Sequence, residues 1–259
     1  MNLTEFDVIL LNSSAGKDSQ AMIDVVTKMA KAQGVKDRVQ VVHAILEEEW
    51  EGTKELAQEQ AEAYGLPIHF VKRSQGSLLE QVEKRRMWPS STARYCTSDH
   101  KRDQVSRIIT TLAKQAQNNG NRPRILNCMG LRAAESPSRA KKNPFEIDRR
   151  NTNSRREVWT WLPIFNLMTD DVWTIIRESG VRHHWAYDAG MPRLSCCFCI
   201  FAPRAALVRA GHLNPKLLER YAEVEQKIGH QFTQKISMVE IKNAVAAGEQ
   251  PGEICTWEM

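Results

Sequence analysis

The stretch NSSAGKDSQAM, residues 12–22, separates two apolar segments of different character. Before it, Phe6–Leu11 (FDVILL) is a short apolar run, which predicts a buried strand. After it, apolar residues recur at helical spacing up to about Ala32, which predicts an amphipathic helix. A loop between a strand and a helix aims backbone N–H groups and a helix N-terminus at one spot. The stretch therefore predicts an anion site.

The side chains of this loop fit an anion as well. Ser13, Ser14 and Ser19 supply hydroxyl donors, and Lys17 supplies a positive charge. The spacing is not that of a Walker A loop, because Leu11 stands where the first glycine is required. The loop also lacks the G-x-G-x-x-G pattern of dinucleotide-binding folds.

Strands and helices alternate along most of the chain. Beyond the first pair we predict strands at 38–45, 68–71, 124–129 and 158–164, and helices at 54–64, 77–84, 98–117, 170–178, 203–210 and 215–228. This alternation predicts an α/β fold with a doubly wound, mainly parallel five-stranded sheet and helices on both faces. We expect residues 1–200 to form the main domain and 201–259 a C-terminal helical extension packed on it. Residues 133–155 are basic and aperiodic, so we expect a surface loop there, and Asn118–Asn121 predicts a turn.

Composition is that of an ordinary globular protein, with 42% hydrophobic and 26% charged residues. No long apolar stretch or basic leader is present, so we expect a cytoplasmic protein with no membrane partner. The formal charge is only +5, but basic residues gather at 84–86, 101–102, 139–142, 149–150 and 155–156. Such clusters are either a solvated surface or a site for a nucleotide, a sulfate ester or nucleic acid.

Three of the six cysteines lie within four residues. Cys196, Cys197 and Cys199 predict metal binding or redox work, although small buried hydrophobes would give the same pattern. Cys128 lies on a predicted buried strand and is expected to be structural, and Cys255 has no assignment. The neighbouring histidines 183 and 184 point in different directions on any regular element, so we favour a structural role over a metal pair.

Residues 14–19, SAGKDS, resemble the SGGKDS pyrophosphate loop of the adenine nucleotide alpha-hydrolase superfamily, the PP-loop ATP pyrophosphatases. Ala15 replaces a glycine, so we expect a negative φ there and close backbone approach at Gly16. Four further segments resemble the phosphoadenosine phosphosulfate (PAPS) reductase family within that superfamily: RYCTSDHK at 94–101, GLRAAESPSR at 130–139, the passage 162–173, and SCCFC at 195–199.

The resemblance implies a nucleotide site with Mg²⁺ bridging the phosphates of ATP. Its catalytic residues would be Lys17, Asp18, Arg132 and Arg139. The nucleotide would be held by Ser13, Ser14, Gly16, Lys17, Asp18, Ser19, His43 and Glu135. The two arginines would neutralise charge on the leaving pyrophosphate, and Glu135 would orient one of them. His43 would line the adenine side, but a hydrogen-bonded sheet-edge histidine is an equal alternative.

Relatives that carry a [4Fe-4S] cluster hold it with four thiolates. Here the resemblance implies Cys96, Cys196, Cys197 and Cys199 as ligands, with zinc as the alternative occupant. The distribution departs from the family pattern, because the earlier segment has a single cysteine rather than a tandem pair.

Three functions remain open from the sequence. The first is ATP activation at the α-phosphate for sulfur transfer, as in DNA phosphorothioation systems, where a cysteine desulfurase and DNA are the partners. The second is a sulfonucleotide reductase acting on PAPS or adenylyl sulfate, although residues 253–256 (EICT) lack the glycine and histidine of its E-C-G-x-H segment. The third is a non-catalytic nucleotide- or DNA-binding subunit. A homodimer is compatible with each.

Overall fold

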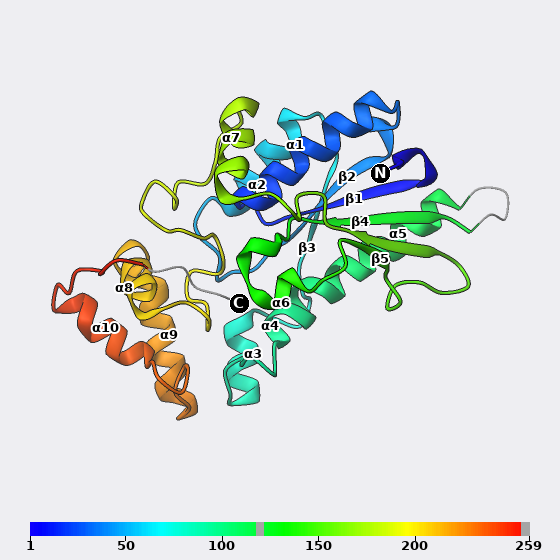
Figure 1. The fold of residues 1–259 in the computed structure, drawn as a ribbon. Coiled ribbons are helices and arrows are strands. Elements are labelled where there is room, and N and C mark those ends of the chain that lie inside the picture. Colours follow the sequence, from blue (N-terminus) through cyan, green and yellow to red (C-terminus); the bar gives the residue numbers. More distant parts are fainter. Residues whose placement is uncertain (118–121, 255–259) are drawn as a thin grey trace. The chain divides into compact units, whose positions relative to one another are not determined.

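A computed structural model of the chain describes residues 1–117 and 122–254 (Figure 1). The chain forms two compact units that interleave along the sequence. The first, here called the sheet unit, comprises residues 1–44, 52–71 and 103–184. The second, the helical unit, comprises 45–51, 72–102 and the chain from Trp185 onward. The domain boundary expected near residue 200 stays a prediction. The predicted turn at 118–121 and Cys255 lie outside the described residues.

The sheet unit contains a six-stranded sheet in the order β3-β2-β1-β4-β6-β5. Its strands are β1 (Val8–Ser13), β2 (Val39–Ala44), β3 (Ile68–Val71), β4 (Arg124–Met129), β5 (Phe145–Ile147) and β6 (Glu157–Trp161). Five of them run parallel, which confirms the predicted doubly wound sheet. The remaining strand, β5, pairs antiparallel with β6 and lies inside residues 133–155, which were expected to form a loop. Three residues are too few to show a strand pattern, so the sequence did not reveal it.

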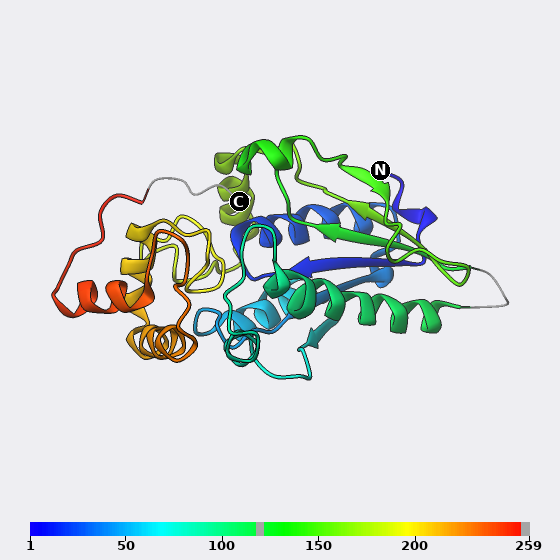
Figure 2. The same cartoon turned by 90° about the horizontal axis from the view of Figure 1, so that it is seen from below.

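Helices cover both faces of this sheet. Alternation along β1 turns Ile9 toward the core shared with α1 (Lys17–Ala32), and Leu10 toward the core shared with α5 (Asp103–Ala116). Figure 2 shows α1 and α5 on opposite sides of β1. The remaining helical elements of the unit are η1 (Leu3–Glu5), η2 (Lys36–Arg38), α2 (Thr53–Ala63), η4 (Ala133–Glu135), α6 (Pro137–Ala140) and α7 (Thr169–Ser179).

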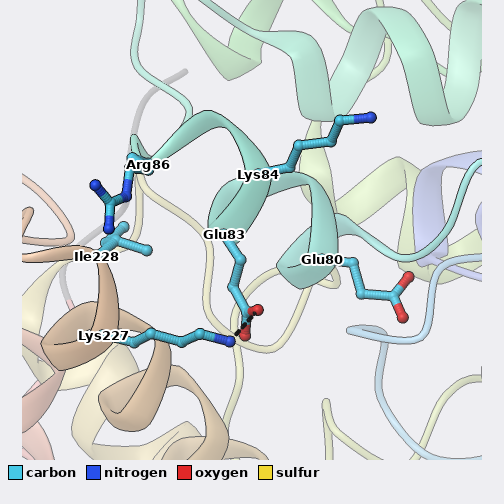
Figure 3. A pocket seen from close by; sticks show the side chains of 6 residues that line it. All are labelled: Glu80, Glu83, Lys84, Arg86, Lys227 and Ile228. Atoms are coloured by element: carbon cyan, nitrogen blue, oxygen red, sulfur yellow. Dashed lines mark hydrogen bonds and ion pairs between the residues drawn. The ribbon is translucent and has the colours of Figure 1, made fainter.

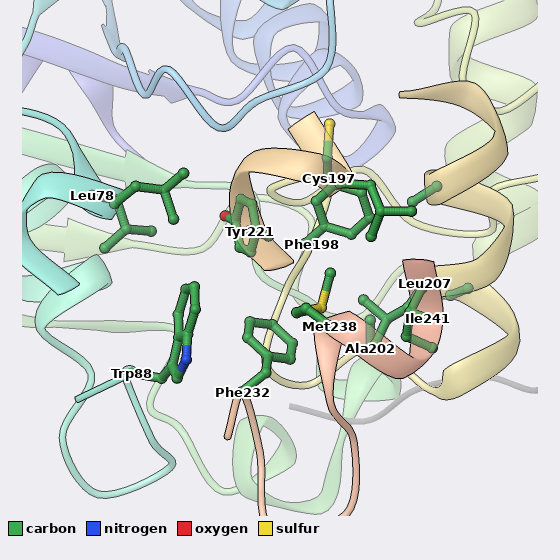
Figure 4. Close-up of a cluster of buried hydrophobic side chains, with 14 of the residues drawn as sticks. Leu78, Trp88, Cys197, Phe198, Ala202, Leu207, Tyr221, Phe232, Met238 and Ile241 are labelled. Carbon is green, nitrogen blue, oxygen red and sulfur yellow. The ribbon is translucent and has the colours of Figure 1, made fainter. Parts of the chain in front are cut away.

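The helical unit is built around an aromatic core. Trp88 stacks on Tyr221 at a centroid distance of 5.4 Å, and Phe232 meets the Trp88 ring edge-on at 5.1 Å (Figure 4). The unit contains α3 (Leu78–Arg85), α4 (Tyr95–Thr97), the π-helical turn η3 (Ser98–Arg102), α8 (Arg204–Leu213), α9 (Pro215–Ile228) and α10 (Met238–Ala246).

Helix α10 is a further C-terminal helix beyond the two that the sequence predicted. It begins at Ser237, whose side chain accepts a hydrogen bond from the backbone N–H of Glu240. Met238 and Ile241 bury its short apolar side. Across the described ranges, no helix combines the length and apolar character needed to cross a membrane.

Candidate functional site

The loop between β1 and α1 is tied together by its own serines. The backbone N–H of Ser14 donates to Ser19 Oγ at 3.1 Å, and Ser19 Oγ donates to the Gly16 carbonyl at 2.9 Å. The backbone N–H of Ala15 donates to Ser13 Oγ at 3.2 Å. Helix α1 starts after Gly16, which supplies no side-chain cap. The first turn of α1 therefore keeps the N-terminal dipole and N–H groups that favour an anion.

The backbone at Ala15 overturns one expectation. Its φ is +54°, whereas Gly16 has φ −82° and ψ 161°. The left-handed residue of the turn is thus the alanine, and the prediction of a negative φ at Ala15 was wrong. The buried methyl group of Ala15 packs with Leu56 and Ala57 of α2. That burial offsets part of the cost of a left-handed alanine.

Charged side chains meet at the N-terminus of α1. Asp18 Oδ1 accepts from Arg132 Nε at 2.6 Å, and Asp18 Oδ2 lies 3.3 Å from Lys17 Nζ. Lys17 is 6% exposed and Arg132 is 3% exposed. Two nearly buried cations therefore share one carboxylate, which gives the trio a formal charge of +1. A site of this charge beside a helix N-terminus attracts a polyanion.

Arg132 reaches Asp18 because β4 ends next to the start of α1. A Cβ atom on Gly130 would lie 2.8 Å from the Asp18 carbonyl oxygen, a distance too short for any other residue type. Glu135 then holds the following segment. Its Oε2 accepts from the backbone N–H of Arg132 at 2.9 Å, and its carboxylate pairs with the guanidinium of Arg139. Glu135 thus contacts the backbone of Arg132 and the side chain of Arg139. The catalytic and binding roles stay predictions.

His43 lies beneath the loop rather than beside open solvent. It is fully buried on β2, its Nδ1 is 3.1 Å from the carbonyl oxygen of Ser13, and its ring meets Phe70 edge-on at 5.9 Å. These contacts brace the end of β1. A role at the adenine stays a prediction.

The two neighbouring histidines have separate structural partners. His184 Nε2 lies 3.1 Å from Thr53 Oγ1, and the ring of His183 meets Trp173 edge-on at 5.4 Å. Their directions differ, as expected for adjacent residues.

Three of the predicted ligands, Cys96, Cys196 and Cys199, lie in the helical unit and interact electrostatically. Burial raises the pKa of Cys196 to about 12, although the charge of Lys101 acts in the opposite direction. Burial also raises the pKa of Cys199, and both thiols feel Cys96 and Lys101. Lys101 Nζ lies 4.0 Å from Glu49 Oε1. Burial acts to lower the pKa of Lys101, but Cys196, Glu49, Cys199 and Cys96 leave it raised overall.

Cys197 has different surroundings. It is 2% exposed and belongs to the apolar cluster around Tyr221 and Phe198 (Figure 4). Its backbone N–H donates to the Glu48 carbonyl at 3.0 Å. Burial raises its pKa, with further contributions from Cys196, Glu49 and Glu48. Its assignment as a fourth ligand stays a prediction. Cys128 is fully buried on β4, as the sequence indicated.

Sequence reasoning gave no role to Lys101, Glu48 or Glu49. Glu48 is buried, its Oε1 accepts from the backbone N–H of Leu79 at 3.1 Å, and burial raises its pKa. The acidic run 47–49 directly after a predicted strand was the available signal, because such ends face ligands in α/β folds.

The thiols do not form a ready site for a single ion. Within residues 1–117 and 122–254, no three His, Cys, Asp or Glu side chains are grouped so that they could hold one. Tetrahedral zinc needs its thiolate sulfurs within about 4 Å of one another, since each Zn–S bond is about 2.3 Å. The zinc alternative therefore gains no support from this geometry.

Comparison with known proteins agrees with this fold. Residues 8–202 match the model of the phosphoadenosine phosphosulfate reductase domain, and the chain belongs to this family. It is 27% identical over 168 residues to an uncharacterised protein of Escherichia phage 186, covering 65% of this chain and 48% of that protein. It is 24% identical over 217 residues to an uncharacterised protein of Methanocaldococcus jannaschii, covering 84% and 47%. The chain thus spans about half the length of these relatives.

Two solved structures share the fold. One is a PAPS reductase from Candida auris in a phosphate complex, at TM-score 0.51 and 18% identity, covering 75% of this chain and 83% of that one. The other is an FMN adenylyltransferase from Candida glabrata with FMN and an ATP analogue, at TM-score 0.50 and 10% identity, covering 73% and 55%. These two likenesses show a shared fold, and the family match over residues 8–202 confirms the family resemblance seen in the sequence.

Proposed function

We propose that this chain binds ATP at the β1–α1 loop and activates it at the α-phosphate for sulfur transfer. The observation that carries the proposal is the meeting of Lys17, Asp18 and Arg132 at the N-terminus of α1. A loop of this kind suits the β- and γ-phosphates of ATP, because main-chain N–H groups, the positive end of a helix dipole and two cationic side chains lie around one site. Mg²⁺ would supply the remaining charge neutralisation on the triphosphate.

The chain's residues divide the work between binding and charge stabilisation. Lys17 and the first turn of α1 hold the pyrophosphate portion. Arg132, which is fixed by its hydrogen bond to Asp18, stabilises the negative charge that grows on the leaving pyrophosphate. Arg139, which pairs with Glu135, would neutralise part of the same charge. An acceptor oxygen bonds to the α-phosphorus while the bond to the pyrophosphate breaks. The products are an adenylated acceptor and pyrophosphate, and a sulfur nucleophile can then displace AMP.

The second half of the proposal concerns the thiols. Cys96, Cys196 and Cys199 are the donors that we assign to an iron–sulfur cluster, with Lys101 balancing the charge of the thiolates. A [4Fe-4S] cube spaces its thiolates farther apart than one tetrahedral ion does, so the lack of a zinc-like grouping among the described residues does not oppose it. When bound, such a cluster would supply sulfur or electron chemistry beside these thiols.

Pyrophosphate release tests the nucleotide half. Wild-type protein with Mg²⁺ should release pyrophosphate from ATP in the presence of an acceptor. Lys17→Ala should release at least tenfold less, because the variant has no ammonium group to bind the phosphate oxygens. Cys128→Ala, a buried position in β4, serves as the control. A Lys17→Ala variant as active as wild type would contradict the proposal.

The family match itself favours a second candidate, sulfonucleotide reduction. This reaction converts PAPS or adenylyl sulfate to sulfite at the expense of a dithiol donor. Sulfite production with either sulfonucleotide, together with untouched ATP, would replace the first proposal with this one. Nucleotide binding without either turnover would support a binding subunit instead. DNA phosphorothioation, with a cysteine desulfurase as sulfur donor, is the specific pathway class that we propose to test first.

A further inference from the structure

A basic pocket of about 480 Å³ lies within the helical unit, apart from the residues assigned to the nucleotide. It is lined by residues of one short stretch of chain: Arg85, Ser91, Thr92, Ala93, Arg94, Tyr95, Ser98, Asp99 and Arg102. Three guanidinium groups and four hydroxyl groups therefore line one hollow. Guanidinium forks and hydroxyl donors are the ligands that proteins use for phosphate oxygens.

The charge of this stretch is large for its length. Residues 84–102 contain six basic side chains and one acidic one, so their formal charge equals the +5 of the whole chain. The single carboxylate, Asp99, is already engaged. Gln81 Nε2 donates to it at 2.7 Å, Ser98 Oγ at 2.5 Å, and Arg85 Nη2 lies 3.7 Å away. The pocket thus retains a net positive charge.

Two of the pocket's arginines, Arg85 and Arg94, stack on aromatic rings. The guanidinium of Arg85 lies 4.5 Å from the centre of the Tyr95 ring, and that of Arg94 lies 5.0 Å from the centre of the Phe201 ring. Stacking fixes the plane of a guanidinium while leaving its edge for hydrogen bonds. The buried Nε of Arg94 has no hydrogen-bond partner among the described residues.

A second pocket of the same unit provides a contrast. It holds about 360 Å³ and is lined by Glu80, Glu83, Lys84, Arg86, Lys227 and Ile228 (Figure 3). Lys227 Nζ pairs with Glu83 Oε2 at 2.6 Å there. Two carboxylates in the lining would repel a phosphate, so the arginine-lined pocket suits a phosphate better than this one does.

We propose that the pocket of Arg85, Arg94 and Arg102 binds the phosphodiester backbone of a nucleic-acid strand. Lys84 and Arg86, the chain neighbours of Arg85, add positive charge beyond the lining of the pocket, which fits a chain of phosphates better than a single one. Tyr95 is buried and its hydroxyl donates to the Met87 carbonyl at 2.6 Å, so its ring is not a platform for bases. Binding is therefore directed at phosphate and tolerant of sequence.

The pocket also lies next to one of the cysteines assigned to the cluster. Its lining residues Tyr95 and Ser98 flank Cys96, one of the thiols assigned to sulfur chemistry. A phosphate bound there lies beside the cysteine segment, as an acceptor of sulfur would need. In this respect the inference rests on the proposed function and deepens it by naming the acceptor's chemistry. Binding itself requires neither ATP nor a loaded cluster.

Fluorescence anisotropy with a labelled oligonucleotide, measured without ATP, tests the inference. The double variant Arg85→Gln/Arg102→Gln should bind at least tenfold more weakly than wild type, since each guanidinium–phosphate pair contributes roughly a factor of ten. The slope of log affinity against log salt should become shallower by about one for each arginine replaced. Homopolymer and mixed sequences should bind alike.

Control variants distinguish a loss of charge at the pocket from a general loss of charge or of structure. Arg204→Gln removes the same charge from α8 of the same unit, at a side chain 50% exposed against 47% for Arg85, and should leave affinity unchanged. Ser91→Glu, on an exposed loop position, should weaken binding through repulsion while leaving the fold intact. Lys17→Ala should bind the oligonucleotide as wild type does, whatever happens to ATP turnover.

Three outcomes would overturn the inference: no oligonucleotide binding by wild type at low salt, equal binding by the double variant, or complete displacement of the strand by an equal concentration of a mononucleotide. The last would mark the pocket as a site for a free nucleotide. Loss of ATP turnover alone would refute the proposed function and leave this binding result standing.

Discussion

Arg132 donates a 2.6 Å hydrogen bond to Asp18, 114 residues earlier in the chain. The guanidinium also donates to the Leu167 carbonyl at 3.2 Å, so it is tied to the segment before α7 as well. This one side chain joins the first turn of α1, which follows β1, to the segment after β4 and the segment after β6. The carboxyl ends of three neighbouring strands are thereby fixed around one spot, which is where an α/β sheet binds its ligand.

Asp18→Asn should cost about 3 kcal/mol of unfolding free energy, since it leaves Arg132 nearly buried without its counter-charge. Pyrophosphate release should fall with it. Urea unfolding measures the first effect. Arg182→Gln is the matched control, because its pair with Glu59 is exposed and should be worth less than about 1 kcal/mol. Equal stability of the Asp18→Asn variant and wild type would show that the ion pair does not support the fold.

Gly130→Ala should destabilise the sheet unit by about 1–3 kcal/mol, as expected for overpacking against backbone. The added Cβ would lie 2.8 Å from the Asp18 carbonyl oxygen and 3.0 Å from the Ser19 nitrogen, and neither can move without distorting the loop. Weaker nucleotide binding should accompany the destabilisation. Gly252→Ala, where nothing lies within 4 Å, is the control and should be neutral. Isothermal titration of ATP and thermal melting provide the two readouts.

Ala15 offers a pair of substitutions with opposite expectations. Ala15→Gly should change stability by less than about 1 kcal/mol, because relief at φ +54° is offset by removal of a buried methyl group. Ala15→Val should destabilise the fold by about 1–3 kcal/mol, since a β-branched residue is strongly disfavoured at that φ. Denaturation midpoints distinguish them. Valine tolerated as well as glycine would mean that the turn adopts another conformation in solution.

Single Cys→Ala variants should fall into two groups that differ in iron content. Protein purified without oxygen should carry iron and absorb near about 400 nm, as thiolate-bound clusters do. Cys96→Ala, Cys196→Ala and Cys199→Ala should each lose most of the iron, whereas Cys197→Ala and Cys128→Ala should keep it, because these two residues are buried while the other three are partly exposed. Iron lost equally from Cys197→Ala would restore the four-thiolate set. Zinc in place of iron in wild type would refute the cluster.

His100 should make stability depend on pH in the acid range. Burial and the charge of Arg73 lower its pKa to about 4 from the ordinary 6.5. The unfolded chain therefore binds this proton at a higher pH than the folded protein does. The contribution is fully present above pH 6.5 and is lost as pH falls toward 4.

His100→Gln should flatten this part of the stability profile, measured by urea unfolding between pH 7 and about 4. The variant also lacks the 2.7 Å hydrogen bond between His100 Nε2 and Gln81 Oε1, so only the slope is informative. Parallel profiles for variant and wild type would show that another group dominates the acid response.

Much of the fold was predictable because buried parallel strands are continuous apolar runs. FDVILL and RILNCM were both recognisable in this way, and the loop between β1 and α1 followed from its glycine, serines and lysine. Strand β5 and helix α10 were missed, since short elements take their stability from partners in space rather than from local pattern. The φ of Ala15 was misjudged for a related reason, because α2 packs over the methyl group.

The sequence by itself determined the family, the doubly wound sheet and the loop between β1 and α1 that we propose for the nucleotide. These features depend on residue order along one segment at a time. Only the tertiary structure decided that Asp18 pairs with Arg132, that Cys197 lies in an apolar core, and that three arginines of residues 85–102 line one pocket. Such relations depend on distances between side chains, which arise when packing brings separate segments together.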